Sequence, residues 1–355
     1  MLRFKTVSCL DKACTGLEAF SLLAPAGWDF EGGIRWSVDD TMMPSTSGFK
    51  IAGDGVEMQF LPGQAFVWTS LPQILLTHPA GTRYLGATLC PLLDSSEFLH
   101  QIMLPALRPG LDDLAIIRDI QPVRMESTLG FETTLRSSGG SASSSGAGIR
   151  VRYRSQGKRY EEALYCTVTT FIFKIPVGSA FIECIFWMAD NLVSIRAEPG
   201  RLDGLKGLLQ TILYSFRFNP LWVEKANRIG IFLKDHQMNK PYSLRQLGRE
   251  IDEAAIPGAG GLQAGRLKES GYRWIADSLC GTSASGEYYD PIQQICVRLP
   301  SGFEQAWASD LGEYLLSNSE DRIEDSGLAG AWKIMESISL ESAAGRPSAT
   351  SATCA

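Results

Sequence analysis

Catalytic groups are the first feature to look for in the sequence, and the familiar combinations are missing from it. The chain has no His-Glu-x-x-His zinc motif, no Gly-x-Ser-x-Gly nucleophile turn and no Gly-x4-Gly-Lys-Ser/Thr phosphate loop. The glycine-rich run Gly258–Gly265 stands between expected helices rather than after a strand, so a helix break explains it better than a nucleotide site. We assign no catalytic residue and expect no cofactor.

Carboxylate pairs and histidines are the other candidates for acid–base chemistry. Adjacent acids occur at Asp39-Asp40, Asp112-Asp113 and Glu161-Glu162. Neighbours in a strand point to opposite faces, so we expect solvated positions rather than paired catalytic groups. The three histidines, His78, His100 and His236, are far apart in sequence, and no nucleophile can be paired with His78. Because no Cys-x2-Cys pair occurs, no metal site is predicted.

Arginines alternate with apolar residues along Ile149–Arg154. Arg150, Arg152 and Arg154 therefore share one face of a predicted strand, and Lys158 follows near the tip of an expected hairpin. An anionic ligand or an acidic partner surface would suit this stripe. The solvated face of an edge strand, whose charge discourages aggregation, is the commoner explanation. The three arginines are retained as candidate ligand- or partner-binding residues.

Tryptophans form the second candidate constellation. Trp28, Trp36, Trp68 and Trp187 all fall on expected strands or strand ends. Such residues could line a concave ligand-binding face, although they more often fill the core between a sheet and its helices. Trp28, Trp36 and Trp68 complete the set of candidate binding residues.

A sheet must position these residues, and its strands are predicted from alternation. Short apolar–polar runs up to residue 136, separated by glycine and proline turns, indicate an antiparallel sheet, interrupted by a helix near Leu93–Leu107. Residues 137–148 are rich in serine and glycine and are predicted to be a flexible hairpin insertion. Tyr165–Ile175 and Ala180–Met188 are the most strand-like segments, and Asp190-Asn191 is a predicted turn.

Helical periodicity begins after Pro199-Gly200. Leucines and isoleucines over Leu202–Leu213 form one apolar stripe, which must cover the tryptophan-bearing side of the sheet. Residues 219–280 form a helical arm: Asn219-Pro220 starts one helix, Ser243–Gln246 has the form of a capping box, and Gln263–Leu279 is a last helix.

The whole chain is predicted to be an α+β protein, with an antiparallel sheet packed by helices. Residues 1–218 form an α/β sandwich, residues 281–338 a small β-rich acidic segment, and residues 339–355 a disordered tail. Residues 281–355 hold 4 basic and 11 acidic residues, a net charge of −7. The sequence leaves open whether the segment 281–338 packs on the sandwich.

Composition narrows the class of protein. At 355 residues the chain is longer than one hydrophobic core usually serves, and its net charge of −6 argues against a general nucleic-acid binder. No window approaches the roughly 18 apolar residues of a membrane-spanning helix. The eight cysteines form no compact framework and no N-glycosylation sequon occurs, so we expect a reduced, cytoplasmic protein.

Three sequence blocks carry a resemblance. Phe20–Trp36 (FSLLAPAGWDFEGGIRW) resembles the opening of a widespread, uncharacterised family of bacterial proteins, and its strand, Pro-x-Gly-Trp turn and strand are similar to the start of PsbP-like domains. The helix Phe98–Leu107, ending in LPALRP, and the block Tyr288–Phe303, continued through Trp332, fit the uncharacterised family better than PsbP itself. The likeness covers most of residues 17–335.

The resemblance implies a PsbP-like α/β sandwich with a helical arm and a short β-rich tail. PsbP-like folds usually serve as binding or assembly modules, and no catalytic residue is carried over. We therefore expect a non-catalytic protein that binds a protein partner through the sheet face or the arginine-rich hairpin. The alternative is a hydrolase or transferase, with a site in the cleft between the sandwich and the helical arm.

Overall fold

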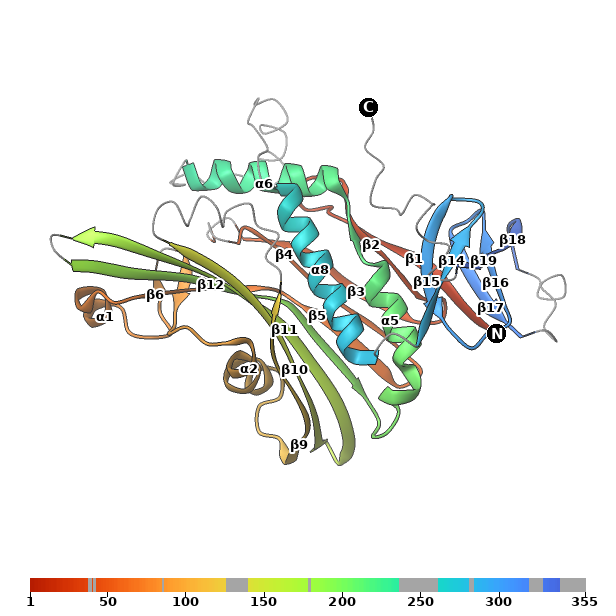
Figure 1. The fold of residues 1–355 in the computed structure, drawn as a ribbon, viewed down its shortest axis with the longest axis horizontal. Coiled ribbons are helices and arrows are strands. Elements are labelled where there is room, and N and C mark those ends of the chain that lie inside the picture. The colour runs from red at the N-terminus through yellow and green to blue at the C-terminus, as the bar shows by residue number, and fades with distance from the viewer. Residues whose placement is uncertain are drawn as a thin grey trace.

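A computed structural model describes residues 1–37, 40, 43–84, 86–125, 140–177, 180–235, 261–280, 284–318 and 328–338 of the chain. Strands dominate these ranges and helices form a minority (Figure 1). The predicted combination of sheet and covering helices is present at this level. The capping-box helix expected near Ser243 and the expected tail 339–355 lie outside the described residues.

The largest sheet has ten strands. Seven of them run antiparallel in the spatial order β3 (Asp29–Trp36), β4 (Ser45–Gly53), β5 (Val56–Leu61), β12 (Ala180–Ala197), β11 (Lys158–Val177), β10 (Ser141–Ser155) and β9 (Asp112–Met125). The other three extend from β12: β6 (Gln64–Thr69) pairs with β12, β8 (Ala87–Leu89) pairs with β6, and β7 (Arg83–Tyr84) pairs with β8. Helix α1 (Pro72–Thr77) lies between β6 and β7 in the chain. Because β6 and β8 pair in parallel, the sheet is mixed rather than fully antiparallel.

The N-terminal and C-terminal strands share a second sheet. Its six strands follow the order β13 (Arg217–Phe218), β2 (Glu18–Pro25), β1 (Leu2–Leu10), β17 (Glu313–Ser317), β16 (Gln305–Ser309) and β18 (Trp332–Ile334). Phe4 lies opposite Tyr314 in this ladder. A third sheet holds β15 (Ile295–Pro300), β14 (Ser285–Asp290) and β19 (Glu336–Ile338). The segment 281–338 therefore joins the N-terminal strands, and residues 1–218 contribute to two sheets rather than one.

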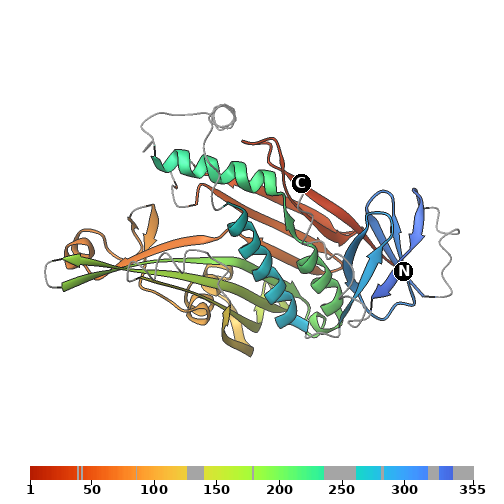
Figure 2. The same cartoon turned by 45° about the horizontal axis from the view of Figure 1, so that its top comes forward.

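Helices cover both faces of the large sheet (Figures 1 and 2). On one face lie η2 (Leu202–Leu205), α5 (Lys206–Ser215), α6 (Pro220–Asp235) and α8 (Gly261–Cys280). On the other lies a continuous helical segment made of α2 (Ser95–Phe98), η1 (Leu99–Met103) and α3 (Leu104–Leu107). The helices predicted at Leu93–Leu107, Leu202–Leu213 and Gln263–Leu279 are confirmed, with small changes at their ends.

The core under α5 is rich in aromatic rings. Leu209, Ile212 and Leu213 are buried and pack in one cluster with Trp28 and with Phe20 of β2. Phe20 also stacks on rings from β4 and from the end of α5, so this core joins the first sheet to the second. The leucine-striped segment thus packs over Trp28 as predicted, although Trp28 lies in the turn between β2 and β3 and the covered core belongs to two sheets rather than one.

The serine-rich segment is a strand, which corrects the prediction of a flexible insertion at 137–148. Residues 141–148 lie in β10 and pair with β11 on one side, and from Ser144 onward with β9 on the other. A side chain is not tolerated at Gly146, because a Cβ there would stand 2.8 Å from the ring of Trp274, which would be a steric clash. Trp274 belongs to α8, which packs on this face of the sheet. Residues 137–139 lie outside the described part of the chain.

The expected turn at Asp190-Asn191 is a β-bulge inside the continuous strand β12. The register between β11 and β12 shifts there, and Asn191 has a φ of 50°. The buried Asn191 side chain accepts a hydrogen bond from Thr167 and donates one to the carbonyl of Lys268 on α8. The bulge therefore fixes α8 to the sheet instead of reversing the chain.

Candidate functional site

The three candidate arginines share one face of β10, as alternation predicted, but two of them already share a buried counter-ion, Glu161. Arg150 contacts Glu161 and forms two hydrogen bonds of 3.1 Å to Asp203. Arg152 donates to Glu161 from Nε at 3.1 Å, and Arg154 lies 3.7 Å from exposed Asp113. The alternating stripe is therefore in large part an internal ion-pair network.

Electrostatics in this network favour the ionised carboxylates. Burial alone would raise the pKa of Glu161, but the backbone N–H of Gly200 and the two arginines outweigh it, and the pKa is lowered. Hydrogen bonds from Arg150, and then from Lys206, lower the pKa of Asp203 to about 2. At neutral pH both carboxylates are charged and hold Arg150 in place.

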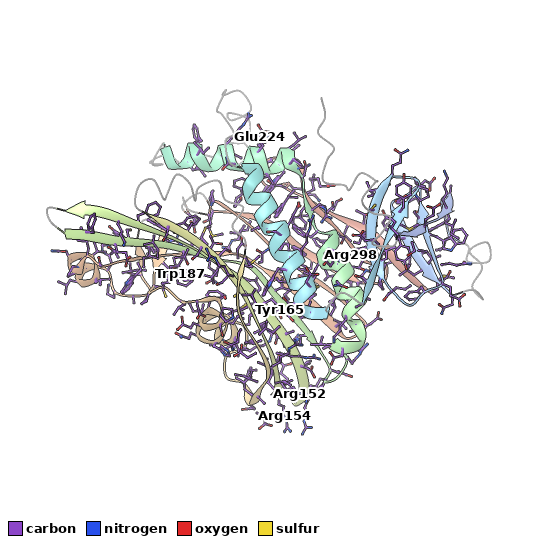
Figure 3. The ribbon with its side chains drawn as sticks, in the orientation of Figure 1. Arg152, Arg154, Tyr165, Trp187, Glu224 and Arg298 are labelled. Atoms are coloured by element: carbon purple, nitrogen blue, oxygen red, sulfur yellow. The ribbon has the colours of Figure 1, made fainter. Side chains whose placement is uncertain are left out.

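A positive excess remains at this end of the sheet. β9 and the segment 149–159 together hold seven basic and three acidic residues, a net charge of +4, in a chain whose net charge is −6. Counting Glu161 and Asp203 against them still leaves +2. Arg152 and Arg154 keep 53% and 45% of their side-chain surface exposed, and Figure 3 shows them at the lower tip of the sheet. An acidic partner would therefore still meet accessible arginines here.

Strand β9 adds an apolar component beside these arginines. It pairs with β10 along one side, and no described strand pairs with its other side (Figure 1). Among the described residues twelve large hydrophobic side chains are exposed, and four of them lie on this strand: Leu114 (46%), Ile116 (53%), Ile117 (42%) and Val123 (48%). We call Leu114, Ile116, Ile117, Arg118 and Val123 the β9 surface.

Arg118 is the cationic member of the β9 surface. It lies directly opposite Arg150 in the ladder, and like charges in that position destabilise a strand pair. Arg150 is neutralised by Glu161 and Asp203, whereas Arg118 has no ion-pair partner among the described residues. Exposed aliphatic side chains on an edge strand, together with an arginine that has no ion-pair partner among the described residues, have the composition of a protein-binding surface.

The candidate tryptophans are not gathered on one face. Trp28 is buried in the core under α5 and donates its indole N–H to Asp54 at 3.1 Å. Trp36, on the edge strand β3, donates to Asp11 at 3.0 Å. Trp68 is half-buried on β6 and packs against the other core. The fully buried Trp187, labelled in Figure 3, belongs to that core. The structure thus divides the candidate tryptophans between two cores, Trp28 and Trp36 in one and Trp68 in the other, and gives Trp28 and Trp36 polar partners inside the protein.

One buried polar cluster was missed by sequence reasoning. Glu162 is fully buried, and its carboxylate accepts hydrogen bonds from Arg108 at 2.9 and 3.0 Å, from Tyr153 at 2.5 Å and from Ser194 at 2.5 Å. Burial first, and the neighbouring carboxylate second, raise the pKa of Tyr153 to about 12. All four acceptor positions of the carboxylate are used, so the cluster is satisfied internally and fixes the end of α3 to the sheet.

Glu161 and Glu162 show what the sequence could and could not indicate. They point to opposite faces of β11, as predicted for strand neighbours, and they do not act on each other. The expectation that they are solvated is wrong, since both are buried. In a strand, Glu162 lies on the same face as Leu164 and Cys166. These apolar neighbours two and four residues away were the feature of the sequence that could have indicated a buried carboxylate.

The histidines have separate environments. His100 on η1 lies 3.5 Å from Asp119 of β9, and His78 accepts or donates a hydrogen bond with Thr77. His236 lies outside the described residues. Within the described ranges no three His, Cys, Asp or Glu side chains cluster as metal ligands do, and no helix is long and apolar enough to cross a membrane.

Comparison with known proteins returned no match to any family model, any curated protein or any solved structure. The site is therefore interpreted from its own geometry.

Proposed function

We propose that this protein is a non-catalytic binding or assembly protein, and that its protein partner docks on the β9 surface. The observation that carries the proposal is the concentration of exposed aliphatic side chains on one strand at the end of the large sheet. Burying a single exposed isoleucine in an interface is worth about 1.5–3 kcal/mol, so a few such residues can dominate a binding site.

The arginine face supports the same location. Arg152 and Arg154 on β10 stand next to β9, so aliphatic and cationic groups are available to one partner. Arginine is enriched at protein interfaces. The buried Glu162 carboxylate, by contrast, has all its acceptor positions filled by Arg108, Tyr153 and Ser194 and has none free for a substrate. The resemblance to PsbP-like folds, which serve as binding or assembly modules, agrees with this function. A cytoplasmic setting is proposed with it, on the scattered, free cysteines.

The test compares three forms of the full chain. The wild type, an Ile116→Ser/Ile117→Ser variant and a Leu311→Ser control are used to capture proteins from a lysate of the source organism, and captured proteins are identified by mass spectrometry. Leu311 is 62% exposed and lies in the turn between β16 and β17, so it tests general hydrophobicity.

Each captured protein is then purified, and its Kd is measured against all three forms. The proposal predicts a partner that binds the wild type and the control alike and binds the double variant at least tenfold more weakly. Equal binding to all three forms, or no partner in the wild-type capture, would exclude the β9 surface as the binding site.

A further inference from the structure

We infer that the partner meets the β9 surface with an acidic, aliphatic segment, and that side chains rather than a shared strand ladder hold it there. This inference rests on the proposed function and names the chemistry of the partner. Two independent observations support it: the interrupted register of β9 and the uncompensated charge of Arg118.

The register of β9 decides between the two modes of docking. An unpaired edge normally invites a partner strand, because its free N–H and C=O groups form a template. β9 shifts register against β10 at three places within 14 residues. Residues 115–116, 118–120 and 123–125 are the only stretches that stay in step with β10. A run of three residues offers one or two outward ladder bonds, which is too few to hold a partner strand.

The same shifts explain why aliphatic side chains are exposed. Leu114 and Ile117 fall in the interruptions, opposite no residue of β10, so the alternation that would turn them toward a core is broken there. Ile116 shares a face with Val151, whose side chain is buried, yet it is exposed because it stands at the rim. The irregular backbone thus leaves apolar side chains exposed along this edge of the sheet.

Charge selects an acidic partner. Arg118 stands opposite Arg150 without a carboxylate of its own, and Arg124 further along β9 likewise has no ion-pair partner among the described residues. Arg152, on the same sheet face as Arg118, is half exposed. A carboxylate that reaches Arg118 would relieve the repulsion within the ladder and form a charge-assisted hydrogen bond. A basic segment would add to the repulsion.

The experiment selects ligands from a phage-displayed library of random decapeptides on the immobilised full chain. Binders eluted by excess soluble protein are sequenced, synthesised and titrated at two salt concentrations. We expect selected peptides to combine aspartate or glutamate with aliphatic residues, and to bind at least fivefold more weakly at 0.5 M than at 0.1 M NaCl, since salt screens exposed charges.

Matched charge reversals test the position. Arg118→Glu should weaken the peptides at least tenfold, whereas Arg35→Glu should leave them unchanged. Arg35 is an exposed residue on β3, the strand at the opposite edge of the same sheet, and its reversal changes the net charge by the same amount. Thermal unfolding of both variants is measured to exclude a loss of folding. Arg118→Lys keeps the positive charge, so it should retain most of the wild-type affinity if Arg118→Glu weakens binding through its charge.

Backbone methylation tests the mode of docking. Peptides N-methylated at alternate positions cannot donate a strand ladder, and we expect them to retain binding within threefold. Loss of binding on methylation, or a selected consensus without acidic residues, would overturn the inference. In either case peptides that still depend on Ile116 and Ile117 would leave the proposed function intact, whereas peptides indifferent to all β9 substitutions would remove both.

Discussion

The buried pair of Arg108 and Glu162 gives the sharpest quantitative prediction for this structure. Arg108 keeps 13% of its side chain exposed and Glu162 keeps none, and two charge-assisted hydrogen bonds of 2.9 and 3.0 Å join them. Arg108→Leu leaves a buried carboxylate with only the hydroxyl groups of Tyr153 and Ser194. Breaking a buried pair in this way costs about 3–5 kcal/mol, so we expect a loss of that size in the free energy of unfolding.

A second substitution separates charge from packing. Adding Glu162→Gln to Arg108→Leu removes the uncompensated charge but keeps a side-chain oxygen for Tyr153 or Ser194. The double variant should therefore be more stable than Arg108→Leu alone, within about 2 kcal/mol of the wild type, since one or two neutral hydrogen bonds remain imperfect. Arg154→Leu is the matched control: its partner Asp113 is 3.7 Å away and exposed, and such surface pairs are worth about 0–1 kcal/mol.

Urea unfolding followed by circular dichroism and by tryptophan fluorescence measures all four proteins. The midpoint should shift strongly for Arg108→Leu and hardly for Arg154→Leu, with the m-value unchanged. If Arg108→Leu lost no more than the control, the carboxylate would not depend on the guanidinium. If the double variant were as unstable as Arg108→Leu, lost packing rather than buried charge would be the cause.

Two further predictions concern packing and pH. Gly271→Ala should destabilise the protein by about 1–3 kcal/mol, because its Cβ would stand 2.2 Å from Oδ1 of Asn191. Gly204→Ala is the control and should be neutral, since a Cβ there has no atom within 4 Å. Equal melting temperatures for the two variants would contradict the close approach of α8 to Asn191. The low pKa of Asp203, about 2 beside Arg150, contributes stability that is present above pH 4 and is lost as the pH falls toward 2. Because Asp203 is 57% exposed, Asp203→Asn should cost less than about 1 kcal/mol at pH 7, and less still at pH 2, where the native carboxylate is partly protonated. Urea unfolding at both pH values would show this difference.

Local periodicity was enough to predict the helices and the faces of strands. Leu202–Leu213 covers the core where its apolar stripe required, and the alternation of Arg150, Arg152 and Arg154 placed all three on one face. These features depend on residues three or four positions apart in a helix, or two apart in a strand. Such local patterns can be read from the sequence without knowing which distant segments pack against them.

The pairing of strands far apart in the chain could not be predicted, because it depends on residues that are distant in sequence. Alternation states which side of a strand is buried but not which strand lies beside it, and β1 pairs with β17 across more than three hundred residues. The serine-rich start of β10 has the composition of a loop, yet Trp274 of α8 needs the absence of a side chain at Gly146. Tertiary packing overrode local propensity there.

Part of the candidate site was accessible from the sequence. The expected hairpin has its tip near Lys158, and the structure pairs Ser155 with Lys158 across it. Counting back from that pair places Arg152 opposite Glu161. That count would have revealed one counter-ion of the arginine stripe. Asp203 could not have been found in this way, because it reaches Arg150 from a helical turn on the covering layer.

The edges of the described sheets explain why β9 stands out. The six-stranded sheet ends in β13 and β18, of two and three residues, and the small sheet ends in the three-residue β19 and in β15, which α5 covers. At the other edge of the large sheet, β3 exposes Asp29, Glu31 and Arg35. Short, covered or charged edges are the usual protections against unwanted strand pairing.

β9 is protected in its backbone but not in its side chains. Its register shifts prevent a regular ladder with another chain, while Leu114, Ile116 and Ile117 remain exposed. Protection against aggregation alone would have been served better by charged residues at these positions. An edge that blocks indiscriminate strand pairing, and still offers apolar side chains and an arginine without an ion-pair partner in the described part of the chain, is suited to one partner of matching shape and charge.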